Sequence, residues 1–77
     1  MQDQSTSNIL VFKTNIKYKK HINAVGRHIE AEPQIIKWNV DLQDVDKILR
    51  IETVDLQPAT VESLVQKAGY YCEELKD

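Results

Sequence analysis

The residues that could do chemistry lie in one short stretch, FKTNIKYKKHI from Phe12 to Ile22, where an apolar run gives way to lysines. His21 is a candidate metal ligand, because a neutral imidazole binds Zn, Cu(II) or Ni(II) well. Tyr18 lies three residues earlier and would project to the same side of a helix. A phenol is a poor ligand at neutral pH. This pair therefore does not close a metal site by itself, and a solvated histidine near a helix start is the simpler interpretation.

Cys72 is the one cysteine of the chain, so it has no internal disulfide partner, which is typical of a protein of the reducing cytosol. Its thiol could supply a soft metal ligand. We favour the alternative that Cys72 is a small buried hydrophobic residue of a strand. His28 lies about two helical turns after His21, too far to share a metal ion with it, and is expected on the helix surface.

Lys13, Lys17, Lys19 and Lys20 form a local positive patch on a chain whose net charge is −2. Free N–H groups at a helix start favour anions, and Tyr18 among these lysines could stack on a nucleotide or a single strand. A dedicated nucleic-acid binder carries a longer basic stripe, so nucleic acid is a less favoured ligand. A basic patch can also dock on an acidic protein surface. A solvated surface loop is the simplest interpretation.

Hydrophobic periodicity predicts the elements that position these residues. The patterns indicate strands over 8–13, 35–42, 47–54 and 70–75, and helices over 17–31 and from Pro58 to a cap at Gly69. Within the second strand, Ile36, Trp38 and Val40 are expected to face the core together. Thr14 and Asn15 are expected to supply the turn and the cap before the first helix.

The order strand, helix, strand, strand, helix, strand predicts an α+β fold, the ferredoxin-like βαββαβ sandwich. A four-stranded antiparallel sheet carries both helices on one face of this fold. Residues 1–7 are polar and are expected to form a flexible N-terminus, and residues 8–77 a single domain. No apolar run approaches a membrane span, and no secretory signal is visible. We therefore expect a cytoplasmic protein that makes no membrane contact.

We expect no enzymatic activity. Acylphosphatases share the ferredoxin-like fold, but their chemistry would need an arginine in the loop after the first strand, and none lies between Asn8 and Gly26. No Ser-His-Asp or Cys-His arrangement is indicated. Asp41, Asp44 and Asp46 lack the glycine and the final glutamate of a calcium loop, so they are interpreted as a hairpin turn.

Four segments, FKTNI, PQIIKWNVDL, KILRIE and KAGYYCEEL, resemble the heavy-metal-associated (copper-chaperone-like) domain family over most of residues 8–75. The family pattern places CxxC across the strand-to-helix turn, after an apolar residue that Ile16 matches. Tyr18 and His21 fall on the two cysteines, and Tyr70 falls beside the metal loop. The resemblance implies the ferredoxin-like fold. With CxxC replaced by Tyr-Lys-Lys-His, it also implies that the two-thiolate copper(I) mechanism is absent.

These observations predict a small protein-interaction or regulatory module with no cofactor and at most weak Zn, Cu or Ni binding. Copper chaperones of the resembled family dock through a basic face, so the resemblance implies an acidic protein surface as partner. One alternative is an atypical metal-binding or metal-transport protein that uses His21, with Tyr18, Tyr70, Cys72 or a second chain adding ligands. Another is anion or nucleic-acid binding through the Lys13–Lys20 cluster. The sequence is also compatible with a homodimer.

Overall fold

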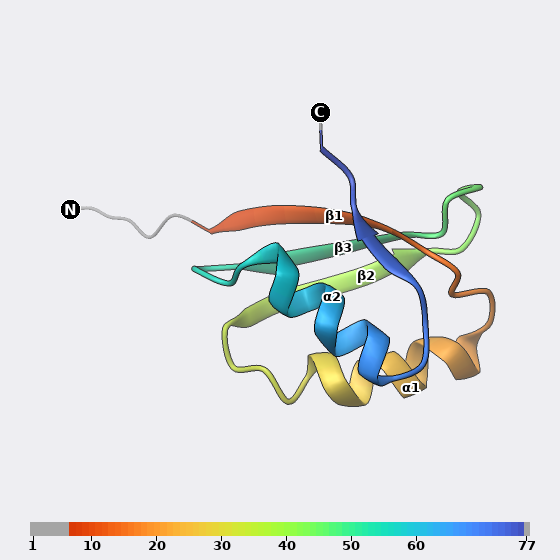
Figure 1. Ribbon diagram of the computed structural model, residues 1–77, viewed down its shortest axis with the longest axis horizontal. Helices are drawn as coiled ribbons and strands as arrows, with labels where there is room; N and C mark the ends of the chain where they lie inside the picture. The colour runs from red at the N-terminus through yellow and green to blue at the C-terminus, as the bar shows by residue number, and fades with distance from the viewer. Residues whose placement is uncertain (1–6, 77) are drawn as a thin grey trace.

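The computed structural model describes residues 7–76 and has the six elements in the predicted order (Figure 1). They are β1 (Asn8–Thr14), α1 (Lys19–Ile29), β2 (Ile35–Asp41), β3 (Ile48–Thr53), α2 (Pro58–Lys67) and β4 (Cys72–Glu74). Apart from Ser7, the predicted flexible segment 1–7 lies outside the described residues. No helix within residues 7–76 combines the length and the apolar character needed to span a bilayer.

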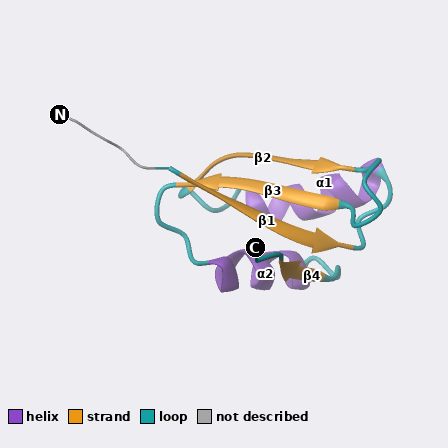
Figure 2. Cartoon of the chain, turned by 90° about the horizontal axis from the view of Figure 1, so that it is seen from above, coloured by secondary structure: helices purple, strands orange, loops and turns teal. Residues whose placement is uncertain are grey.

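The four strands form one antiparallel sheet in the order β2-β3-β1-β4. Both helices lie on the same side of this sheet, and in the view of Figure 2 the strand β3 passes in front of α1. This arrangement confirms the predicted ferredoxin-like sandwich. It brings the end of β1, the start of α1 and the segment before β4 to neighbouring places, although they are far apart in the sequence.

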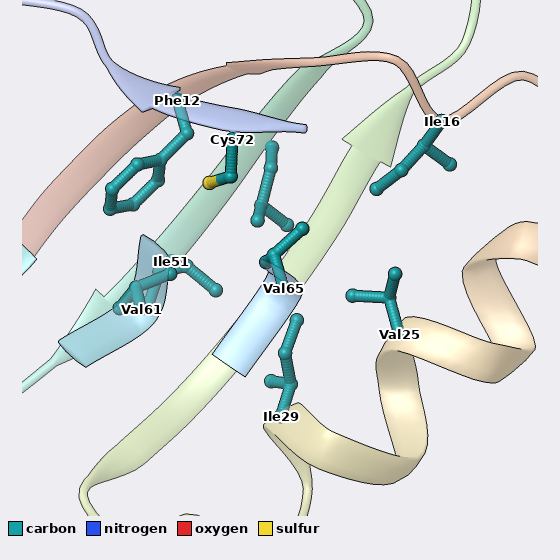
Figure 3. Packing of buried hydrophobic residues seen from close by; sticks show 9 residues of the cluster. Phe12, Ile16, Val25, Ile29, Ile51, Val61, Val65 and Cys72 are labelled. Carbon is teal, nitrogen blue, oxygen red and sulfur yellow. The ribbon is translucent and has the colours of Figure 1, made fainter. Parts of the chain in front are cut away.

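The hydrophobic core fills the space between the sheet and the two helices (Figure 3). Its fully or almost fully buried members come from every element except β2 and from the β1–α1 loop: Phe12, Ile16, Val25, Ile29, Leu49, Ile51, Val61, Val65 and Cys72. Each large apolar side chain removed from water contributes about 1.5–3 kcal/mol. β2 is an edge strand, and its Ile35, Trp38 and Val40 are half-buried against this core.

The prediction for Ile36 was wrong, because β2 is not regular along its length. The pairing with β3 shifts between Ile35 and Lys37, and this bulge places Ile36 outside the alternation. Ile36 is consequently 56% exposed, while Ile35 takes the core-facing position instead. A bulge adds one residue to a strand, so a two-residue period read through it assigns the wrong face to everything on one side.

Gly26 explains how α1 approaches the sheet closely. A Cβ built at this position would lie 3.0 and 3.1 Å from two ring carbons of Trp38, closer than side chains normally pack. Glycine lowers helix stability by about 1 kcal/mol relative to alanine, and here it leaves room for the indole of β2. At the end of α2, Gly69 has φ +96°, which confirms the predicted left-handed cap.

The last strand is shorter than predicted. β4 covers only Cys72–Glu74, because the preceding two residues use their N–H groups elsewhere. Tyr70 N–H donates to the Val65 carbonyl at 3.2 Å, which continues the end of α2. Tyr71 N–H donates to the side chain of Asn15 at 2.9 Å. Both residues therefore belong to a loop that packs beside the β1–α1 turn.

Candidate functional site

Hydrogen bonds join the β1–α1 turn to the two loops beside it. Thr14 N–H donates to the Asp46 carbonyl at 3.1 Å, and Thr14 Oγ1 donates to the Lys47 carbonyl at 2.6 Å. Asn15 Oδ1 accepts the Tyr71 N–H. The prediction that Thr14 and Asn15 cap the first helix was therefore wrong. These side chains fix the turn to the β2–β3 and α2–β4 loops, while Tyr18 is the N-cap of α1 and makes no side-chain capping bond.

His21 makes a side-chain hydrogen bond at the start of α1. It is the third residue of α1, and its Nδ1 accepts the backbone N–H of Lys17 at 3.1 Å. This is similar to one half of a capping box, in which the third helical side chain accepts the N-cap amide, but here the amide belongs to Lys17, one residue before the N-cap Tyr18. Because Nδ1 is an acceptor here, the neutral ring carries its proton on Nε2. The imidazole thus has a structural partner within its own turn.

Two tyrosine rings flank this imidazole. The ring centroids of Tyr18 and His21 are 5.0 Å apart in an edge-to-face arrangement, and those of His21 and Tyr70 are 4.9 Å apart and tilted. Such pairs contribute about 0.5–1.5 kcal/mol each beyond their burial. His21 and Tyr70 are half-buried, whereas Tyr18 is 59% exposed. We call Tyr18, His21 and Tyr70 the aromatic cluster; its outer member faces solvent.

The donor groups near the turn do not fit a closed metal site. Coordination through His21 Nδ1 would displace the Lys17 amide, and coordination through Nε2 would move the proton onto Nδ1, which also breaks that hydrogen bond. Tyr18 and Tyr70 offer phenols. Within residues 7–76, no group of three or more His, Cys, Asp or Glu side chains is arranged to hold a metal ion. His28 lies half-buried further along α1.

Cys72 lies in the core rather than at the turn. It is 3% exposed and packs in the same cluster as Phe12 and Val65 (Figure 3). Burial, and to a lesser extent the negative charge of Glu62, raises the pKa of the Cys72 thiol from 9.0 to about 12. The thiolate that soft metals require is therefore strongly disfavoured at neutral pH. Ile16 is likewise fully buried, and its side chain in the core anchors the β1–α1 turn.

The structure divides the predicted lysine patch into two parts. Lys17, Lys19 and Lys20 are exposed at the start of α1, around Tyr18. Lys13 belongs to β1, opposite Glu73 of β4, and its Nζ lies 3.8 Å from a carboxylate oxygen of Asp46. Lys17, Lys19 and Lys20 are called the lysine face below, because Lys13 already has acidic neighbours.

Sequence reasoning missed the contacts that cross between loops. Nothing in the local pattern identifies Asn15 as the acceptor for Tyr71, because the two residues are 56 positions apart. The Tyr71 hydroxyl also donates to Glu73, and this hydrogen bond raises the pKa of Tyr71. No capping-box pattern marks His21 either, because its hydrogen-bond partner is the amide of Lys17, one residue before the N-cap Tyr18.

No family model matches the chain, and no curated protein matches its sequence. Solved structures do match its fold. The apo form of the HMA domain of the copper chaperone for superoxide dismutase has a TM-score of 0.78 at 18% identity, covering 99% of this chain and 74% of that one.

Two further neighbours cover nearly all of their own chains. The PacS N-terminal domain from Synechocystis PCC6803 has a TM-score of 0.76 at 16% identity, covering 90% of this chain and 98% of that one. The apo N-terminal domain of ZntA has a TM-score of 0.76 at 18% identity, covering 92% and 96%. The chain therefore has the ferredoxin-like fold of heavy-metal-associated (HMA) domains.

Proposed function

We propose that this chain is a protein-interaction module of the heavy-metal-associated type, in which Tyr18 and His21 stand where the family pattern has its two cysteines. The observation that carries the proposal is the internal engagement of His21. Its Nδ1 accepts the Lys17 amide and its ring lies between two tyrosines, so contacts within the protein already engage this imidazole.

The lysine face supports an acidic protein surface as the partner. The first turn of α1 contains Lys19 and Lys20 and no acidic residue. Cations at a helix N-terminus oppose the helix dipole, at a cost of about 0.3–1 kcal/mol each. These lysines offer charge that favours encounter with an acidic surface. The exposed ring of Tyr18 beside them offers a residue type that is enriched in binding hot spots.

An NMR titration with a Glu/Asp-rich peptide tests this docking. We expect amide shifts concentrated at Lys17–His21 and Tyr70, with an affinity that falls as salt rises. Lys19→Glu/Lys20→Glu should weaken binding at least about tenfold. The same double change should slightly stabilise the fold, because acids suit the start of a helix.

The matched control is Lys67→Glu/Lys76→Glu, which changes the net charge equally at exposed positions outside α1. It should leave the peptide affinity within about threefold. Equal weakening by both double variants would show a general charge effect and refute docking through the lysine face. Tighter binding of single-stranded oligonucleotide than of the peptide would favour a nucleic-acid ligand instead.

Metal titration tests the loss of the metal site. One equivalent of Zn(II), Cu(II) or, under reducing conditions, Cu(I) should leave the ring signals of His21 unchanged. The control is His21→Gln, which removes the imidazole and keeps an acceptor for the Lys17 amide. Stoichiometric shifts that occur in the original chain and vanish in His21→Gln would identify His21 as a ligand and refute this part of the proposal.

A further inference from the structure

The outer edge of β2 is a strand edge that pairs with no other strand of residues 7–76. β2 ends the sheet order, so within residues 7–76 its only strand partner is β3. Trp38 and Val40 pack against the core. By the alternation of a strand, Lys37, Asn39 and Asp41 project to the opposite face of the sheet.

The backbone groups of this edge can be assigned from hydrogen bonds on the other side of the sheet. Leu75 N–H donates to the Val11 carbonyl at 2.9 Å, so Val11 directs its polar groups toward β4. Val11 is paired through β3 with Asn39, whose N–H and C=O consequently point toward β3. The N–H and C=O groups of Trp38 and Val40 therefore point to the outer edge.

The sequence of this edge is complementary to itself. It reads Lys37-Trp38-Asn39-Val40-Asp41, with opposite charges at its two ends and an aromatic and a β-branched residue around a central asparagine. We propose that β2 pairs antiparallel with β2 of a second copy of this chain, about a two-fold axis at Asn39. This dimer goes beyond the proposed docking function and does not depend on it.

Pairing about Asn39 gives complementary side-chain pairs on both faces of the sheet and also hydrogen-bonds the outward backbone groups. Lys37 of each copy lies opposite the partner's Asp41 on the open face. Trp38 lies opposite the partner's Val40 on the core-facing side, and the outward backbone groups of these two residues exchange hydrogen bonds. Asp41 Oδ1 already accepts the Gln43 N–H at 3.0 Å, and a carboxylate has a second oxygen for the lysine.

Shifting the pairing to a neighbouring register removes the contact between Lys37 and the partner's Asp41. The backbone direction also permits axes at Trp38 or at Val40, but these place Lys37 opposite the partner's Asn39 or Gln43 rather than an acid. The bulge at Ile36 and the turn after Asp41 confine regular pairing to these five residues. The other sheet edge, β4, has only three residues. An isologous pair therefore closes on itself and does not grow into a filament.

A charge swap tests the dimer by sedimentation equilibrium of the full chain. The fluorescence of Trp38, the one tryptophan, provides a second readout on dilution. Lys37→Asp places two acids opposite each other, and Asp41→Lys two lysines, so each change should weaken association about tenfold or more. The double variant Lys37→Asp/Asp41→Lys restores opposite charges and should return the affinity to within about threefold. A chain that stays monomeric up to about 1 mM overturns the proposal.

Cross-linking locates the interface independently. Asn39 would form a non-hydrogen-bonded pair with its own copy, where Cα atoms lie about 4.5 Å apart, within the range of a disulfide. Asn39→Cys should therefore give a disulfide-linked dimer on mild oxidation. Arg50→Cys, an exposed position on β3, should not, and the original chain with its buried Cys72 should not. Equal cross-linking of Asn39→Cys and Arg50→Cys would overturn the β2 interface.

Discussion

Replacing Thr14 by valine should lower the free energy of unfolding by about 2–4 kcal/mol, although the two side chains have almost the same shape. Thr14 is 5% exposed, donates its hydroxyl to the Lys47 carbonyl and accepts the Ile16 N–H at 3.2 Å. Valine offers neither a donor nor an acceptor. The substitution thus leaves the part-buried Lys47 carbonyl and the buried Ile16 amide without these partners, and each such group costs about 1–3 kcal/mol.

Urea unfolding followed by circular dichroism measures this loss. Thr14→Ser retains the hydroxyl and removes one methyl group, so it should cost only about 1 kcal/mol. Thr53→Val is the matched control elsewhere in the sheet. Thr53 is also buried, but its hydroxyl makes one hydrogen bond, to the Gln34 carbonyl at 2.7 Å. If Thr14→Val costs no more than Thr53→Val, the turn is not held by the hydroxyl of Thr14.

The sequence-based prediction succeeded where one physical rule acts alone. The patterns predicted a strand over 47–54 and a helix from Pro58, and both elements form, with Leu49 and Ile51 buried in β3 and Val61 and Val65 buried in α2. Ile36 failed because a bulge depends on how two strands pair, which no single segment contains.

The predictions for the candidate site also succeeded or failed according to whether the contacts are local in the sequence. The resemblance placed Tyr18, His21 and Tyr70 near one turn, and the ring distances place them side by side. Local spacing did not reveal the partners of Thr14, because its hydroxyl bonds to Lys47, 33 positions away. A threonine before a helix favours capping when only the local chain is considered. In the folded chain the Thr14 hydroxyl instead donates to the Lys47 carbonyl and accepts the Ile16 N–H.

Contacts within the protein hold the β1–α1 turn in place. Ile16 anchors it in the core, Thr14 and Asn15 join it to two other loops, and His21 closes the helix start. A binding surface benefits from such order, because groups that are already fixed lose less entropy when a partner arrives. Because Lys17, Lys19 and Lys20 are exposed, substitutions that change their charge should have little effect on the stability of the fold.

The stability of the domain should fall with rising pH above about pH 9 because of Cys72. Its pKa is raised to about 12 in the folded protein, first by burial and then by Glu62, against 9.0 for an exposed thiol. Below pH 9 both states keep the proton and the thiol contributes no slope. Between 9 and 12 the unfolded chain loses its proton while the folded chain retains it, so the unfolding free energy should decrease by about 1.4 kcal/mol per pH unit.

Unfolding curves collected at several pH values isolate this effect when compared with Cys72→Ala. All other titratable groups are common to both proteins. The difference between the two slopes therefore belongs to Cys72. Glu62→Gln should reduce the difference only in part, because burial is the larger cause. Parallel stability curves for the original chain and Cys72→Ala would show that the thiol is not desolvated as the structure places it.

The same burial should protect Cys72 from alkylation. At about pH 8, a thiol pKa of about 12 instead of 9.0 lowers the thiolate fraction about a thousandfold, and the thiolate is the form that reacts. Iodoacetamide should consequently modify the folded chain at least about a thousandfold more slowly than the urea-unfolded chain. A rate within about tenfold of the unfolded chain would place a reactive thiol within reach of solvent, and would reopen Cys72 as a ligand beside the β1–α1 turn.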